Sequence, residues 1–150
     1  MLEVPAALKV EHEKLHADLS AATKIAGKTG EAARHVAAVL HEHFEREEEC
    51  ALPPLALLGP IGADHITPAM QSVIALTDRL KAEMPRMLSE HKTIVHALEE
   101  LARAAVAERH PEVSRFVEEL TTHAKTEEQV LYPAAILVGE FLKLKFASVR

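Results

Sequence analysis

Residues 43–53, His-Phe-Glu-Arg-Glu-Glu-Glu-Cys-Ala-Leu-Pro, recur in altered form as residues 123–133, His-Ala-Lys-Thr-Glu-Glu-Gln-Val-Leu-Tyr-Pro. Both stretches contain His-x-x-x-Glu-Glu, and in both a proline follows the histidine by 10 positions. A Glu-His pair precedes each stretch, Glu11-His12 in the first half and Glu90-His91 in the second. This repeat predicts two similar helical hairpins related by a pseudo-twofold axis, with a site on that axis.

The spacing within each motif is helical. Positions four apart share one face of an α-helix, so each histidine stacks with the glutamate that follows it. Leu40 comes three positions before His43, and Leu120 three before His123, so both motifs lie on apolar stripes. His12 and His91 also lead apolar stripes. We therefore expect all of these side chains to point into one core.

The chain pattern predicts an all-α fold. We expect helices over about residues 4–26, 31–52, 68–107 and 111–145, with a kink or restart at Pro85 and another kink at Pro133. The proline- and glycine-rich segment 53–64 is predicted to be a loop over one end of the bundle. No stretch alternates with a strand period. Residues 1–150 are predicted to form one domain, an up-down-up-down four-helix bundle.

Composition excludes several classes of partner. The net charge is −6, from 17 basic and 23 acidic residues, so neither nucleic acid nor an anionic membrane is an expected partner.

Cys50 is the single cysteine, so no internal disulfide can form and a reducing compartment is favoured. Residues 1–5 lack the basic start of a secretory signal, and the apolar stretch 52–63 is interrupted by prolines and glycines. We expect a cytoplasmic location.

Six residues are candidate metal ligands: His12, His43, Glu47, His91, His123 and Glu127. Burying two carboxylates and four imidazoles without partners is very costly, and metal coordination compensates for that cost. Imidazole with carboxylate suits iron, manganese or zinc. Two glutamates from two helices can bridge two ions, so that each ion has two histidines and keeps open positions for water or a small molecule.

The paired His-x-x-x-Glu-Glu motifs, each preceded on the neighbouring helix by Glu-His, resemble the hemerythrin-like (HHE cation-binding) domain family. The resemblance covers about residues 4–144 and implies a four-helix bundle with two non-haem iron ions held by the six candidate ligands. Oxygen-carrying hemerythrins have a fifth histidine as His-x-x-x-His on the third helix. Here His91 and His96 are five positions apart, so the pattern is closer to bacterial di-iron proteins associated with repair of iron centres.

Other residues near the motifs have two interpretations each. We favour His16 as a partly buried structural histidine over a fifth ligand or supporting partner, and His96 is not expected to bind metal. For Tyr132 we favour packing at the end of the bundle over donation of a hydrogen bond near the metals. Four more glutamates either orient ligand histidines or lie on solvated faces and in ion pairs between helices: Glu11, Glu48, Glu90 and Glu128.

Three functional hypotheses follow from a metal site of this kind. The first is a di-iron protein that binds or reacts with dioxygen, peroxide or nitric oxide as a sensor, scavenger or detoxifier. The second is a module that stores or donates iron without catalytic turnover. The third is a bundle whose metal is structural. We expect the protein to be a monomer or a homodimer.

Overall fold

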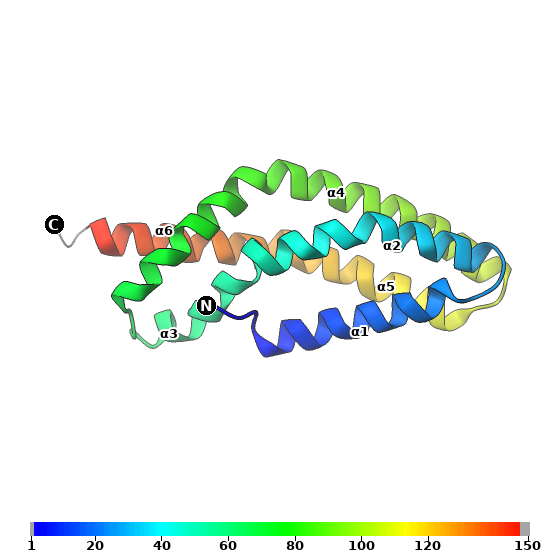
Figure 1. Ribbon diagram of the computed structural model, residues 1–150, viewed down its shortest axis with the longest axis horizontal. Coiled ribbons are helices and arrows are strands. Elements are labelled where there is room, and N and C mark those ends of the chain that lie inside the picture. The colour runs from blue at the N-terminus through cyan, green and yellow to red at the C-terminus, as the bar shows by residue number, and fades with distance from the viewer. Residues whose placement is uncertain (1, 148–150) are drawn as a thin grey trace.

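The computed structural model describes residues 2–147, which form an all-α four-helix bundle with up-down-up-down connections. Four long helical segments run along a common axis, and both tight hairpin connections lie at the same end (Figure 1). The segments are α1 (Ala6–Thr23), α2 (Lys28–Arg46), α4 (Val73–Ala107), and α5 (Pro111–Thr126) with its continuation α6 (Tyr132–Ala147). The predicted fold class is confirmed.

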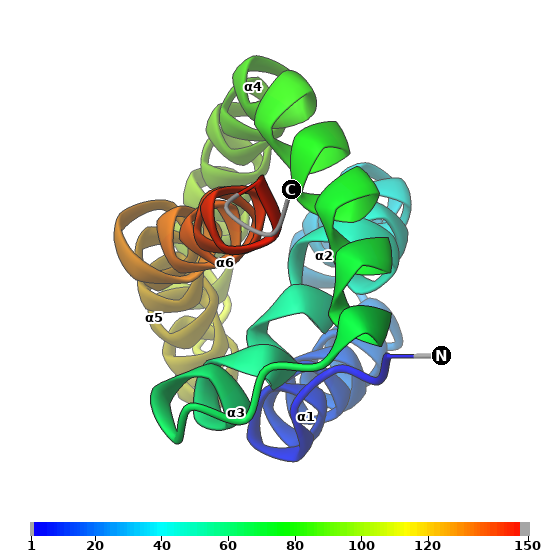
Figure 2. The same cartoon turned by 90° about the vertical axis from the view of Figure 1, so that its left-hand side faces the viewer.

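The four segments occupy the corners of a square when viewed along the bundle (Figure 2). Helix α1 contacts α2 and α5, and α4 contacts α2, α5 and α6, so α1 and α4 lie diagonally opposite each other. Each of the four segments therefore has two neighbouring segments, and side chains from all four can reach the bundle axis.

None of the helices in residues 2–147 has the length and apolar character needed to cross a membrane.

The first hairpin turn lies three residues earlier than the sequence suggested, since α1 ends at Thr23 and not near residue 26. Helix α2 begins at Lys28, three residues earlier than expected, because Gly27 adopts φ 85° and turns the chain directly into the helix. The Glu108 carboxylate, just beyond α4, accepts hydrogen bonds from the backbone N–H groups of Thr29 (2.6 Å) and Lys28 (3.2 Å). It thereby supplies acceptors that the first turn of α2 lacks.

The segment after α2 is helical, so the prediction of a loop at residues 53–64 was wrong. A 3₁₀ turn at Pro53–Leu57 leads into the short helix α3 (Leu58–Gly62), and a second 3₁₀ turn at Pro68–Ser72 precedes α4. Prolines are compatible with the first turn of a helix, where no intrahelical N–H donor is required. Runs of proline that stop one helix can therefore start another.

Helix α4 runs without interruption through Pro85, so this proline does not restart the helix. Figure 1 shows α4 bending along its length. An interior proline removes one backbone hydrogen bond and pushes the preceding turn away, which bends a helix without ending it.

The core has apolar clusters on both sides of a polar layer. Towards the hairpin end lies a cluster that includes Leu15, Leu40, Phe44, Ile94 and Leu120. Towards the opposite end lies a cluster of Ala51, Leu52, Leu55, Leu80, Met87, Tyr132 and Ala135. On each of the four segments, the candidate ligands lie between residues of the first cluster and residues of the second. Residues packed against a cluster are counted with it. The candidate site is therefore enclosed along the bundle axis by apolar side chains.

Candidate metal centre

Six buried side chains meet between the two apolar clusters. They are His12 on α1, His43 and Glu47 at the end of α2, His91 on α4, and His123 and Glu127 at the end of α5. Each is at most 4% exposed. The structure thus brings together all of the residues that the sequence selected, which we call the six-residue cluster. Their role as metal ligands stays a prediction.

One half of the cluster, the first donor set, consists of His43 and His91 with one oxygen from each glutamate. The two Nε2 atoms are 2.8 Å apart, and His43 Nε2 lies 2.5 Å from Oε1 of Glu47. Oε1 of Glu127 lies 3.5 Å from His91 Nε2. These atoms lie within 4.8 Å of one another and could hold one metal ion.

The other half, the second donor set, consists of His12 and His123 with the remaining oxygens of the same glutamates. The two Nε2 atoms are 3.0 Å apart. Oε2 of Glu47 lies 3.5 Å from His12 Nε2, and Oε2 of Glu127 lies 3.2 Å from His123 Nε2. Each carboxylate therefore presents one oxygen to each histidine pair, which is the arrangement that two bridging carboxylates require.

Both glutamates open a π-helical turn, η1 (Glu47–Ala51) and η4 (Glu127–Leu131). In each turn the N–H of the residue five positions later, Leu52 or Tyr132, donates to the carbonyl of that glutamate. A π turn inserts one residue into an α-helix and is frequent at functional sites. The regular helices predicted from the sequence do not include either turn.

Four more carboxylates surround the cluster and face the outer nitrogens of its histidines. Oε1 of Glu11 lies 2.5 Å from His123 Nδ1, and Oε1 of Glu128 lies 2.9 Å from His91 Nδ1. A carboxylate that accepts the Nδ1 proton leaves the Nε2 lone pair free for a metal and fixes the ring. The interpretation of these glutamates as orienting groups is therefore the one that the geometry favours.

The remaining two carboxylates are more distant. Oε1 of Glu90 lies 3.4 Å from His43 Nδ1, and Oε1 of Glu48 lies 3.6 Å from His12 Nδ1. In every case the carboxylate comes from a neighbouring helical segment of the bundle, and the four pairs follow one another around the axis in the order α2, α1, α5, α4. We call these four glutamates the outer carboxylates.

The two halves differ at positions that the repeat makes equivalent. Arg46 forms an ion pair with Glu90 and so holds it beside His43, whereas the equivalent of Arg46 is Thr126. Phe44 stacks on the His12 ring with a centroid separation of 4.6 Å, whereas the equivalent of Phe44 is Ala124. The pseudo-twofold relation therefore holds for the six-residue cluster and for the pairing of the outer carboxylates, but not for Arg46 and Phe44.

The two glutamates of the cluster have opposite pKa shifts. Burial alone would raise the pKa of Glu47, but hydrogen bonds from His43 and His91 outweigh burial and hold that pKa below its ordinary value. Burial, followed by repulsion from Glu47, raises the pKa of Glu127. Two carboxylates in one dry site repel each other, and the ionised form of the pair requires nearby positive charge.

Three histidines of the cluster bind protons more tightly than an ordinary histidine. Burial by itself lowers the pKa of His123, but a hydrogen bond to Glu127, the charge of Glu127 and a hydrogen bond to Glu11 together raise it to about 9. The pKa values of His12 and His91 are also raised, because the carboxylates around them outweigh the effect of burial. A site that attracts protons through buried carboxylates attracts metal cations by the same field.

The donor atoms of the cluster fit bound cations. The buried Oε2 atoms of Glu47 and Glu127 accept no well-aligned hydrogen bond, although each lies near a histidine Nε2, which is unfavourable in an interior. Nε2 of His43 and Nε2 of His91 lie 2.8 Å apart, and neither can donate to the other when both rings direct an Nδ1 proton to a carboxylate. A cation in each donor set would relieve both conflicts.

The structure adds Tyr132 to the site, where the sequence analysis had favoured a packing role. Its side chain is fully buried, and its hydroxyl donates a hydrogen bond to Oε1 of Glu47 at 2.6 Å. Burial, followed by the charges of Glu47 and Glu127, raises the pKa of Tyr132, so the phenol keeps its proton. The signal that was missed is the π turn η4, which an α-helical period does not reveal.

The two other histidines near the motifs stay outside the cluster. His16 is exposed and touches Phe44 with the edge of its ring, so the favoured interpretation as a partly buried structural histidine was wrong about its burial. The side chain of His96 is 70% exposed and lies near Glu99 and Glu100. Neither side chain points towards the donor sets.

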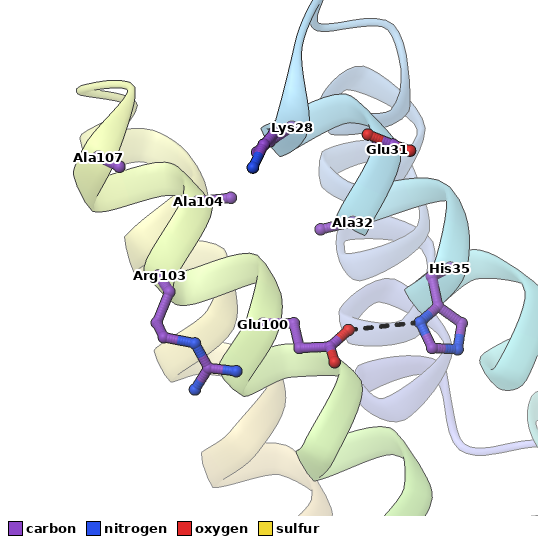
Figure 3. Close-up of a pocket in the computed structure, with 8 residues that line it drawn as sticks. All are labelled: Lys28, Glu31, Ala32, His35, Glu100, Arg103, Ala104 and Ala107. Atoms are coloured by element: carbon purple, nitrogen blue, oxygen red, sulfur yellow. Dashed lines mark ion pairs between the residues drawn. The ribbon is translucent and has the colours of Figure 1, made fainter.

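Surface hollows lie beside the cluster and also far from it. A hollow of about 270 Å³ is lined by His12 and Glu48 among others, and another of about 440 Å³ by His123 and Glu11 among others. Figure 3 shows a separate groove between α2 and α4, near the hairpin end, where Glu100 pairs with His35 at 3.7 Å. That groove contains no residue of the cluster, so we assign it no part in the site.

A bundle that buries four histidines and two carboxylates at one level belongs to the class of metal-binding four-helix proteins. A family model of the hemerythrin HHE cation-binding domain matches residues 3–135, and the chain therefore belongs to this family. Searches among curated proteins and among solved structures return no match. Membership of the family, together with the two donor sets, shows that the protein is a metal-binding protein.

Proposed function

We propose that the six-residue cluster holds two iron ions and that this di-iron centre binds or reacts with dioxygen, peroxide or nitric oxide. The proposal rests on one observation, which is that the two oxygens of each carboxylate face different donor sets. Glu47 and Glu127 each direct Oε1 to the first donor set and Oε2 to the second. Two shared carboxylates with two histidines per position form a site for two ions, about 3.5–4 Å apart in such centres.

The donors at each position are compatible with iron. Each position has two imidazole nitrogens and two carboxylate oxygens from the protein. Four donors complete the tetrahedral coordination of a structural zinc ion. Iron commonly accepts further ligands, so the same four donors leave open positions at iron. Manganese fits the donors as well, and metal analysis distinguishes the two.

The chain's own residues hold and shield the centre. Glu11, Glu90 and Glu128 orient the rings of His123, His43 and His91 and keep their Nε2 atoms directed inwards. The apolar clusters above and below exclude bulk water from the axis. Bound iron would supply open coordination positions and redox chemistry to a small molecule. The hollow beside His12 and Glu48 offers such a molecule a short route from the surface.

We also propose a cytoplasmic protein that acts in sensing, scavenging or a stress response, with no nucleic acid or membrane as partner. The single cysteine, Cys50, is buried and free, which suits a reducing compartment. The net charge of −6 opposes binding to polyanions. The protein would act as a monomer or a homodimer.

The test is metal analysis combined with spectroscopy. Protein purified anaerobically with its native metal should contain two iron ions per chain, and its visible spectrum should change on exposure to oxygen, peroxide or nitric oxide. Two iron ions that are lost reversibly to a chelator, with no spectral response to any of the three molecules, would support iron storage or donation instead. Zinc at full occupancy would contradict the proposal.

A further inference from the structure

Tyr132 is placed among the atoms of the first donor set. Its hydroxyl oxygen lies 2.6 Å from Glu47 Oε1, 3.1 Å from His91 Nε2 and 3.5 Å from His43 Nε2. Donor atoms about 2.1 Å from one metal ion, at right angles, are ~3 Å apart. The phenol oxygen therefore has the spacing of a neighbouring ligand, in addition to that of a hydrogen-bond donor.

The π turn η4 is the reason why Tyr132 reaches this position. In a regular α-helix, a residue five positions after Glu127 is rotated about 140° away from it. In η4 the Tyr132 N–H donates to the Glu127 carbonyl, so the two residues stack on one face. Apolar side chains that include Leu80, Met87 and Ala135 surround the ring and leave its hydroxyl directed into the site.

The second donor set has no counterpart of this phenol. The repeat makes Leu52 equivalent to Tyr132, and Leu52 follows its own π turn and is also fully buried. A leucine side chain offers no ligand atom. The pseudo-twofold site is thus asymmetric at this pair of positions. Tyr132 contacts three atoms of the first donor set, whereas Leu52 offers no ligand atom to the second.

We propose that the oxygen of Tyr132 is a fifth protein ligand of the metal ion held by His43 and His91, which makes the two metal positions inequivalent. The inference rests on the proposed di-iron function. On binding, the phenol O–H bond breaks, the proton leaves to solvent, and an oxygen lone pair forms the bond to iron(III). No electron is transferred. The position at His12 and His123 keeps only four protein donors and so retains more exchangeable sites.

The assignment can be tested directly because Tyr132 is the only tyrosine of the chain. Protein is loaded with two equivalents of ferrous iron and oxidised in air. Its visible spectrum should then show a phenolate-to-iron(III) charge-transfer band, and resonance Raman excitation in that band should enhance tyrosine ring vibrations. Mössbauer spectra of ⁵⁷Fe-loaded protein should show two distinct iron sites.

The matched variant is Tyr132→Phe, which keeps the ring and removes the oxygen. It should retain two iron ions per chain, lose the charge-transfer band, and give Mössbauer parameters for the two irons that move closer together. Wild-type protein with two iron ions but no tyrosine vibrations would overturn the inference and leave the proposed function standing, even if the variant did not fold. Wild-type protein that retained no iron would overturn both.

Discussion

Oε1 of Glu11, on α1, lies 2.5 Å from Nδ1 of His123, on α5, although Glu11 adjoins His12 in the sequence. The carboxylate therefore supports the histidine of a neighbouring helix and not the one beside it. Glu90 has the same relation to His43, since it adjoins His91 in the sequence. Each Glu-His pair links two helices to the centre, one through the histidine and one through the glutamate.

The first prediction concerns this link. Glu11→Gln should lower the affinity for iron by about 10–100-fold, because a neutral amide accepts the Nδ1 proton more weakly than a carboxylate does. Affinity is measured by competition with a chelator of known strength. Glu13→Gln is the matched control, since Glu13 is exposed on the same helix. Equal affinities in the two variants would show that Glu11 has no orienting role.

The same link predicts that the outer carboxylates differ in importance according to their distances. Glu128 lies 2.9 Å from His91 Nδ1, whereas Glu48 lies 3.6 Å from His12 Nδ1, beyond hydrogen-bonding distance. Glu128→Gln should therefore weaken iron binding more than Glu48→Gln does in the same chelator competition. The reverse order would show that metal binding rearranges the outer carboxylates.

A second prediction tests the bridges. Glu47→Ala or Glu127→Ala should remove one oxygen from each donor set, so each variant should lose both metals or retain one weakly. Metal content per folded chain is measured by elemental analysis. His16→Ala should retain two metals, because His16 is exposed and outside both sets. An unchanged stoichiometry in both glutamate variants would mean that the bridging assignment is wrong.

A third prediction concerns the contact that holds α6 against α4. A Cβ added at Gly139 would overlap Thr77 Oγ1 and lie 2.5 Å from Thr77 Cβ. Thr77 is buried and donates its hydroxyl to the Ile74 carbonyl, so it has little freedom to move. Gly139→Ala should reduce the free energy of unfolding by about 1–3 kcal/mol, as overpacked cores do.

The control for Gly139→Ala is Gly62→Ala in α3. No heavy atom lies within 4 Å of a Cβ added there. This variant should be neutral or gain ~0.4–1 kcal/mol, because alanine reduces the entropy of the unfolded chain. Chemical denaturation of both variants gives the comparison. Similar stabilities for the two would show that α6 shifts easily on α4.

Much of the site could be predicted because it rests on local periodicity. The His-x-x-x-Glu spacing fixes which residues share a helix face, and the repeat shows that two such faces meet, so the buried positions of His43 and Glu127 follow from the sequence. The pairing of outer carboxylates with histidines did not follow. It depends on which helices are neighbours around the axis, and intrahelical spacing holds no information about this.

Departures from the α-helical period explain what the sequence analysis missed. Tyr132 reaches the site only because η4 contains one extra residue per turn. The repeat also makes Cys50 and Val130 equivalent, since each is seven positions after its motif histidine, yet Cys50 is fully buried and Val130 is 55% exposed. The segment that follows η1 folds back through Pro53–Leu57, whereas η4 continues directly into α6. Different continuations therefore give equivalent positions different surroundings.

The last prediction links metal, pH and stability. Without metal, the surrounding carboxylates raise the pKa values of His12, His91 and His123, that of His123 to about 9, so folding increases the proton affinity of all three groups. A group whose pKa is raised by folding stabilises the folded state below its unfolded pKa, about 6.5, and that stability is lost as pH rises through the folded pKa. The metal-free protein should therefore become less stable between pH 6.5 and pH 9.

The loaded protein should respond in the opposite direction, because metal must displace the protons held by the histidines. Iron affinity should rise with pH up to about 9, the pKa of His123. An ordinary histidine, with a pKa of about 6.5, would stop competing with metal at a lower pH. At pH 7 and a free metal concentration about 100-fold above the dissociation constant, loading should add ~2.7 kcal/mol to the free energy of unfolding. Thermal melts of loaded and chelated protein at pH 5, 7 and 8.5 measure both trends. The gap in Tm should widen at each step, and a gap that stayed constant across this range would show that protons and metal do not compete for the same histidines.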